Sequence, residues 1–385
     1  MKRTLLATAI ALTMFNVAAQ EYSTNKAIET VTIYGNQQKA QEATGAAQYI
    51  GEQDLEKFKY SDIQRIIRQA PGVSLQIEDG YGLRPNISIR GVATERSGRI
   101  TLLEDNVLIA PAPYSAPSAY YFPTAGRMSA FEVVKGPAAI TQGPYTIGGA
   151  INMISTPIPS TQGGQVTLEA GQDATYRAHA TVGGQNDNGF GYLLEAHQWQ
   201  SDGFQDIDRS DNDTGLNVTD LTMKLAYAPK DSRHSVELKL QYTDQDSEQS
   251  YLGLTDADFA NNAQRRYGLS ALDNISTEHT QVMLNYAFQI NKDLNFTAVA
   301  YNNTHKRDWF KTEGIDLDGS GNAQDFSSTS WSDVVNAINT NEAIDDISVS
   351  QLQGILNGTI DTAEGSIQLR SNNREYYSRG VQFGL

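Results

Sequence analysis

The chain has 385 residues, and its 45 acidic against 29 basic side chains give a net charge of −16. This balance disfavours nucleic acid as a partner, because phosphates require a basic surface. The absence of cysteine excludes disulfides, thiolate metal sites and cysteine nucleophiles. The 32 Gly and 19 Tyr, beside only 3 Trp, favour a β-rich protein with many turns.

Residues 1–19 predict a secretory signal peptide. Lys2 and Arg3 form a charged start, an apolar stretch runs from Leu5 to Phe15, and Val17-Ala18-Ala19 provide a small-residue cleavage site. The apolar stretch is too short to span a membrane, and no later run approaches about 18 apolar residues. We therefore expect export across an inner membrane without a transmembrane helix.

The following leader, residues 20–46, contains the stretch IETVTIYG at residues 28–35. Val31 and Ile33 alternate there with polar side chains, which is typical of a β-strand, yet the polar flanks carry no partner strand. An unpaired strand invites pairing with another chain. The residues alone favour the alternative, a short edge strand of the domain that follows.

We expect residues 47–157 to form a small mixed α/β domain. A capping box of Ser61 and Gln64 predicts a helix that ends at Pro71-Gly72. Asp105-Asn106 stands between two apolar runs and predicts a hairpin turn. Short strands are predicted in VSLQ (73–76), ISIRG (87–91), ITLLEDNVLI (100–109), FEVVKG (131–136) and QGPYTIGGAINMIS (142–155). The last stretch is not a phosphate loop, because no Gly-Lys-Ser/Thr follows its glycines.

Residues 158–385 change to long alternating strands. Residues 221–227, 236–242 and 282–288 each alternate apolar with polar side chains, at about the length of a membrane-spanning barrel strand once the ends are included. A soluble β-sandwich would alternate too. The connections favour a transmembrane β-barrel, because short turns alternate with long polar loops. The turns are at 185–189, 229–233 and 290–293, and the loops are at 201–217, 244–278 and 304–365.

Several motifs resemble one family in order and in sequence. They are VTIYG, IIRQAPGVSLQ, ISIRGV, LLEDNVLI and FEVVKGPAAITQGPYTIGGAINMIST, which follow the order of the plug domain of TonB-dependent outer-membrane receptors. APAPYSAPSAYYFP (110–123) and SYLGLTDADFANNAQRRY (250–267) resemble the ferric-dicitrate-type subgroup. The resemblance implies an α+β plug domain followed by an antiparallel transmembrane β-barrel. It also implies import of an iron chelate, ferric citrate, into the periplasm.

The resemblance also assigns partners and a location. Glu29, Thr30, Val31, Thr32 and Ile33 stand where the family has its TonB box, which an energy-transducing TonB protein captures by strand addition. The expected setting is the outer membrane of a Gram-negative cell, with the protein as a monomer in contact with lipid. No cofactor is expected, because the iron chelate is cargo. No signalling domain is expected between Ala19 and Ile28.

The sequence departs from the family pattern in three places. Lys135 stands where the plug usually has Arg, which loses bidentate pairing with a carboxylate. Residues 164–385 supply roughly eight strand-length segments, against about 22 strands in transporters of this kind. Leu385 is not the terminal aromatic residue of a finished barrel. We therefore expect about the first third of a barrel, in a sequence that continues natively.

Capture of an anionic chelate requires local cations, preferably arginine, whose fork matches carboxylates. The candidates are Arg265 and Arg266 in the 250–267 loop, Arg96 and Arg99 in ATERSGRIT, and Arg307 with Lys306 and Lys311 in THKRDWFKTEG. The alternative for each is a solvated loop charge or a pairing with Asp256, Asp258 or Asp308. Arg90 and Lys135 are expected to lock the plug, with Arg90 paired to an inward-facing barrel glutamate, either Glu195 or Glu237 or a residue beyond the end of this sequence.

Other chemistry finds little support in the sequence. DLDGSGN (316–322) opens like a calcium loop, but Ser327 stands where the bidentate Glu is required. The five His are scattered without metal-ligand spacing, so no metal site is expected, and only His305 falls in a predicted outer loop. No nucleophile elbow occurs, so we expect no enzyme. The rival functions are import of another siderophore, cobalamin or an oligosaccharide, and surface binding by an exported β-protein without transport.

Overall fold

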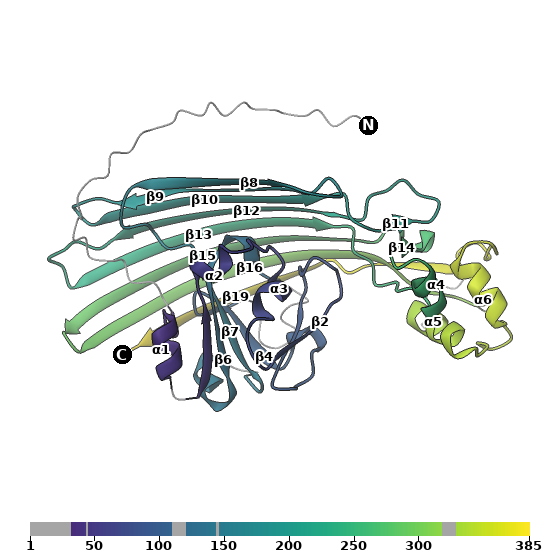
Figure 1. Ribbon diagram of the computed structural model, residues 1–385, viewed down its shortest axis with the longest axis horizontal. Helices are drawn as coiled ribbons and strands as arrows, with labels where there is room; N and C mark the ends of the chain where they lie inside the picture. The colour runs from purple at the N-terminus through teal and green to yellow at the C-terminus, as the bar shows by residue number, and fades with distance from the viewer. Residues whose placement is uncertain (1–31, 44, 110–120, 144–145, 318–328) are drawn as a thin grey trace, which may run out of the picture.

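The computed structural model describes residues 32–43, 45–109, 121–143, 146–317 and 329–385. Its strands form a five-stranded sheet and a ten-stranded sheet, with two further pairs of short strands. The small sheet and its helices lie against one face of the large sheet (Figure 1). We call that face inner and the opposite face outer.

The small sheet follows the predicted mixed α/β pattern, in the order β1-β6-β7-β4-β5. Its strands are β1 (Ala46–Ile50), β4 (Ile100–Glu104), β5 (Val107–Leu108), β6 (Met128–Lys135) and β7 (Gly149–Ser155), while β2 (Val73–Gln76) pairs with β3 (Asn86–Ile89). β4 and β7 are parallel, and the other pairs are antiparallel. The predicted hairpin is confirmed: Asp105 and Asn106 have φ of 49° and 62° and join β4 to β5.

Short helices surround the small sheet and close its core. They are α1 (Gln37–Glu42), α2 (Glu52–Leu55) and α3 (Ile63–Ile67), with 3₁₀ turns η1 (Glu95–Ser97), η4 (Ala125–Arg127) and η5 (Gly136–Gln142). α3 buries Ile66 and Ile67 against Phe131 of β6. The predicted capping box is wrong by one residue, because Asp62 is the N-cap and accepts from the N–H of Gln64.

The large sheet is built of long strands in the order β17-β16-β15-β13-β12-β10-β9-β8, with β18 and β19 also paired to β16. The strands are β8 (Gly163–Ala170), β9 (Tyr176–Gln185), β10 (Phe190–Ser201), β12 (Leu216–Tyr227), β13 (His234–Ser247), β15 (Asn274–Asn291), β16 (Leu294–Ile315), β17 (Thr329–Ser330), β18 (Ile367–Ser371) and β19 (Arg374–Gly384). The predicted short turns are confirmed between β9 and β10, β12 and β13, and β15 and β16. We call this the turn end, and the opposite end the loop end.

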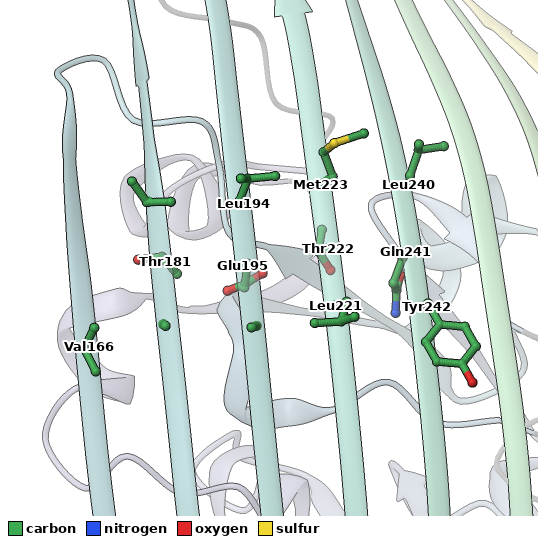
Figure 2. A pocket seen from close by; sticks show the side chains of 13 residues that line it. Val166, Thr181, Leu194, Glu195, Leu221, Thr222, Met223, Leu240, Gln241 and Tyr242 are labelled. Carbon is green, nitrogen blue, oxygen red and sulfur yellow. The ribbon is translucent and has the colours of Figure 1, made fainter. Parts of the chain in front are cut away.

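The two faces of the large sheet differ as the alternation predicts. Leu194 and Leu221 are each 48% exposed on the outer face, whereas Glu195 and Thr222 are 4% and 3% exposed on the inner face. A shallow apolar hollow of about 620 Å³ lies on the outer face, and Ala180 and Ala196 are among its lining residues. Figure 2 shows the larger apolar side chains Leu194, Leu221 and Leu240 that also line it. The sheet is therefore apolar outside and polar toward the small sheet.

The strands extend further toward the loop end than predicted. The third predicted loop, 304–365, is wrong at its start, because residues 304–315 continue β16. His305 and Arg307, both placed in a loop by the sequence, instead lie on this strand and are buried on the inner face. The outer face is no longer apolar in this part of β16, so the amphipathic signal ends before the hydrogen-bonded ladder does.

The long connections at the loop end are folded. They contain β11 (Asp206–Ile207), β14 (Arg265–Arg266), η6 (Gly268–Ser270), α4 (Asp256–Asn261), α5 (Trp331–Thr340) and α6 (Val349–Leu356). Tyr267, Trp331 and Leu352 belong to one hydrophobic cluster there. Within the described ranges, none of the helices is both long and apolar enough to cross a membrane.

The N-terminal stretch is described only from Thr32. Residues 32–35 are not a strand, so for them the predicted edge strand is wrong. Gly35 has φ of +77°, which bends the backbone, and the N–H groups of Ile33, Tyr34 and Gly35 all point to one carboxylate. The predicted signal peptide and Glu29, Thr30 and Val31 lie outside the described residues.

Candidate functional site

A cluster of cations and aromatic rings lies at the loop end, between the small sheet's domain and the inner face of the large sheet. We define the loop-end cluster as Arg84, Arg96, Tyr251, Arg307, Trp309 and Lys311. Arg307 and Trp309 are inward residues of β16, Tyr251 belongs to the connection after β13, and Arg96 lies in η1. The cluster therefore joins three segments that are distant in sequence.

Two stacked rings form the centre of this cluster. The rings of Tyr251 and Trp309 stack with centroids 4.4 Å apart and 28° between their planes. The guanidinium carbon of Arg96 lies 4.9 Å from the Tyr251 centroid, and that of Arg307 lies 5.4 Å from the Trp309 centroid. Lys311 Nζ lies 5.2 Å from Tyr251 and 5.5 Å from Trp309. Each cation is thus within the range of a cation–π interaction.

Arg84 adds a buried positive charge near Arg307 and Arg96. It is 4% exposed, and its Nη1 donates to Gln249 Oε1 at 3.1 Å. Burial lowers the pKa of Arg84 to about 10; Asp79 opposes this, and the nearby charges of Arg307 and Arg96 add to it. At this cluster, three of the buried polar atoms that have no hydrogen-bond partner in the described structure are Gln249 Nε2, Tyr251 Oη and Trp309 Nε1. The cluster therefore offers unused donors together with positive charge.

Carboxylates compensate part of this charge. Arg96 pairs with Glu78 at 2.7 Å, and Lys311 pairs with Glu313 at 2.8 Å. Asp79 is already engaged, since it accepts from the backbone N–H groups of Tyr81, Gly82 and Arg84. The arrangement suits an acceptor-rich anion, which could bind the unused donors and the partly exposed guanidinium of Arg96.

The other predicted ligand residues lie elsewhere. Arg265 bonds Asp208, Asp258 and Asn357, so it joins three connections, as in the alternative of a pairing with Asp258. Hydrogen bonding to Asp208 raises the pKa of Arg265. Arg266 is buried and donates to the carbonyl oxygens of Glu248 and Ser270. Arg99 is exposed and forms no ion pair among the described residues.

The predicted lock residues do not pair with the large sheet. Arg90 is exposed with φ of 57°, and within the described ranges it forms no ion pair with Glu195 or Glu237. Its left-handed backbone follows directly after the last residue of β3. Lys135 instead donates to the carbonyl oxygen of Pro71 at 2.6 Å, and burial, then the charge of Arg90, lowers the pKa of Lys135.

A different buried network joins the two sheets. Arg127 pairs with Glu104 at 2.8 Å within the small domain and with Asp220 of β12 at 2.8 Å. Lys239 of β13 pairs with Glu104 at 2.6 Å and with Asp105 at 2.7 Å. The side chains of Arg127 and Lys239 have no exposed surface. We call these five residues the junction network.

The junction network predicts a loss of stability in acid. Burial acts to raise the pKa of Glu104, but the charges of Arg127 and Lys239 outweigh it and lower that pKa to about 2. The stability that ionised Glu104 contributes is therefore complete above its unfolded pKa of about 4.3 and is lost as the pH falls toward about 2. The denaturation midpoint of the purified protein in detergent, measured across this window, should decrease as the pH is lowered. Glu104→Gln should flatten that dependence, and an equally steep dependence in both proteins would contradict it.

Comparison with known proteins supports the first part of the fold. A family model described as the TonB-dependent Receptor Plug Domain matches residues 39–150. This region is a TonB-dependent receptor plug. The matched residues include the strands of the small sheet up to the start of β7. The large sheet that this domain contacts has the antiparallel form of the receptor barrel.

Curated proteins that resemble about half of the chain are transporters, not enzymes. The chain is 31% identical over 222 residues to the vitamin B12 transporter BtuB of Vibrio vulnificus, across 56% of this chain and 35% of that protein. It is 26% identical over 196 residues to the vitamin B12 transporter BtuB of Photobacterium profundum, across 50% and 31%. The chain thus spans about a third of the length of these curated relatives.

Solved structures share the fold at low sequence identity. The unliganded ferric citrate transporter FecA superposes with a TM-score of 0.62 at 24% identity, over 73% of this chain and 43% of that one. The ferric yersiniabactin receptor FyuA of Yersinia pestis superposes with a TM-score of 0.59 at 17% identity, over 72% and 43%. These likenesses establish the plug and barrel-type sheet.

Part of the site was missed in the sequence for an identifiable reason. Arg307, Trp309 and Lys311 are two residues apart, so a strand reading of this segment would have placed them on one face. Arg84 and Tyr251 gave no such signal, because each lies in an irregular segment. Among the described residues, no group of three or more His, Asp or Glu could hold a metal ion. The segment 316–322, which opens like a calcium loop but lacks the required Glu, lies mostly outside the described residues.

Proposed function

We propose that this protein acts as an outer-membrane, TonB-dependent transporter that brings an iron chelate, ferric citrate, into the periplasm. The loop-end cluster is the observation that carries the proposal. It gathers four cations against the plug of a protein whose net charge is −16. A citrate complex is anionic and rich in carboxylate oxygens, which match guanidinium forks and free N–H and O–H donors.

The outer face supports a membrane location. Apolar side chains such as Leu194, Leu221 and Val282 are exposed there on β10, β12 and β15, while polar residues face the plug. A lipid-exposed wall requires this arrangement, since hydrocarbon neither solvates polar side chains nor satisfies an open backbone. In this proposal the protein is a monomer surrounded by outer-membrane lipid. It reaches that membrane after export, which the signal peptide of residues 1–19 directs.

Energy would enter through the N-terminal leader. Residues 29–33 act as the TonB box, and a periplasmic TonB protein captures them by adding a strand, since backbone hydrogen bonds give grip without demanding a particular side chain. Pulling on the box then displaces part of the plug, so that the chelate passes along the inner face of the barrel.

The proposal is tested by ferric citrate binding to the purified protein in detergent. Arg96→Gln and Arg307→Gln are each expected to weaken binding by about ten- to a hundredfold, because each removes a charge-assisted contact. Arg233→Gln is the matched control, since Arg233 is an exposed arginine at the turn end. Equal affinities in all three variants would exclude the loop-end cluster as the citrate site.

A second candidate, cobalamin, is favoured by the 31% identity to a vitamin B12 transporter. The stacked Tyr251 and Trp309 could pack against a flat corrinoid, for which the surrounding cations are dispensable. Competition between cyanocobalamin and ferric citrate separates the two. Tight cyanocobalamin binding that survives Arg96→Gln and Arg307→Gln would replace the iron chelate as cargo.

A further inference from the structure

The end of the predicted TonB box is held by a buried carboxylate of the plug. Glu132, on β6, has no exposed surface. Its Oε2 accepts from the N–H of Ile33 at 2.8 Å, and its Oε1 accepts from the N–H groups of Tyr34 and Gly35, each at 2.8 Å. Three consecutive backbone donors therefore surround one side chain.

The environment of Glu132 makes it depend on these donors. Asn152 Nδ2 of β7 also donates to Oε2, at 2.9 Å, which fixes the carboxylate toward the N-terminal segment. Within the described ranges Glu132 has no cationic partner, so N–H groups alone compensate its charge. Removing the segment would leave a buried carboxylate with one of its four donors, which is costly.

Side-chain packing reinforces the contact. Ile33 and Tyr34 pack against a small hydrophobic cluster that includes Leu103, Val134 and Ala150. These residues belong to β4, β6 and β7, so the segment is docked on the sheet itself.

The docked backbone cannot also be a strand. In a strand, successive N–H groups point to opposite sides, whereas here three successive groups converge on one anion. The left-handed φ of +77° at Gly35 closes this concave arrangement, which is the form of a backbone anion nest. Residues 33–35 can therefore bind Glu132 or pair with a partner strand, but not both.

We propose that Glu132 is a latch that holds the end of the TonB box in a nest and that strand addition by TonB must open. The identity of the partner rests on the proposed function; the latch itself does not. Opening the nest leaves Glu132 with one of its four donors in the middle of the sheet, because β6 lies between β1 and β7. Capture of the box would thus weaken the plug at the position where the pull arrives.

The latch is tested by cysteine labelling, since the chain contains no cysteine. Thr32→Cys is introduced alone and together with Glu132→Gln, which keeps the shape of the side chain but loses its charge. The maleimide labelling rate in outer-membrane vesicles is expected to rise about tenfold or more with Glu132→Gln. Asp54→Asn, an exposed charge removal on α2, should leave the rate unchanged.

A second variant keeps Glu132 intact and guards against misfolding. Gly35→Ala places a side chain at φ of +77°, with its Cβ 2.9 Å from Thr32 Oγ1, so it should open the nest from the other side. Faster labelling in both variants supports the latch. Unchanged labelling in Gly35→Ala and Glu132→Gln overturns it.

Binding of a purified TonB periplasmic domain separates the latch from the proposed partner. Glu132→Gln should raise the affinity by about tenfold, because the competing contact is weakened. If labelling accelerates but the TonB domain binds neither protein, the latch stands and TonB is overturned as partner. If TonB binds both proteins equally and labelling is unchanged, TonB stands and the latch is overturned.

Discussion

Replacing Arg127 with methionine is expected to lower the opening free energy of the plug by roughly 3–5 kcal/mol. The substitution leaves Asp220 buried without its cation, and Glu104 keeps only Lys239. A buried pair gains little over an apolar pair, but breaking it leaves an uncompensated charge in a place that water does not reach. The effect should therefore exceed that of any single apolar contact at this boundary.

Hydrogen exchange of β4, β6 and β7 in mild guanidinium measures this opening free energy. Arg65→Met on α3 is the matched control, because the side chain of Arg65 is 66% exposed, and its change should stay within about 0.5 kcal/mol. Adding Asp220→Asn to Arg127→Met should recover part of the loss. Exchange that is the same in Arg127→Met and Arg65→Met would show that the junction network does not hold the plug.

The second large effect is expected from Val31→Pro. Proline removes a backbone donor and fixes φ near −65°, both of which oppose strand addition. If residues 29–33 are the TonB box, uptake of ferric citrate should fall by more than about tenfold while the amount of protein at the cell surface is unchanged. Uptake by whole cells, with surface labelling in parallel, gives both numbers.

The control is Ser23→Pro, which changes the same leader outside the predicted box. It should leave uptake at the level of the parent protein. A silent Val31→Pro would favour the rival function, a surface-binding β-protein that captures no partner strand. Loss of surface protein in both variants would indicate an export defect. The uptake measurement would then be repeated with Val31→Asp, which keeps the backbone donor.

The regular part of the fold could be predicted because its signals are local. Alternation in residues 221–227 and 236–242 reports burial on one face, and the short turns fix which strands are neighbours. The Asp105-Asn106 hairpin follows from two residues that tolerate positive φ. Each of these features is determined by a few adjacent residues.

The site could be predicted only in part, because its contacts are long-range. Arg96 and Arg307 were candidates from charge alone, but their meeting through Trp309 depends on β16 continuing past its apolar stretch. Arg265 was a candidate from charge too, yet it pairs with Asp208 and Asp258 and joins the connections at the loop end. Arg127 and Asp220 are 93 residues apart, and no local pattern marks them as partners.

The length of β16 sets how far the rim of the large sheet would stand above a membrane. Its 22 residues extend about 70 Å along the strand, or about 55 Å vertically at the usual barrel tilt, against about 40–45 Å for a whole bilayer. The rim would then rise about 10 Å above the headgroups, roughly one Debye length in physiological salt. Arg307 stands eight residues before that end, about 20 Å lower at the same tilt, so in the proposed transporter an anionic chelate would pass the rim before it reached this arginine.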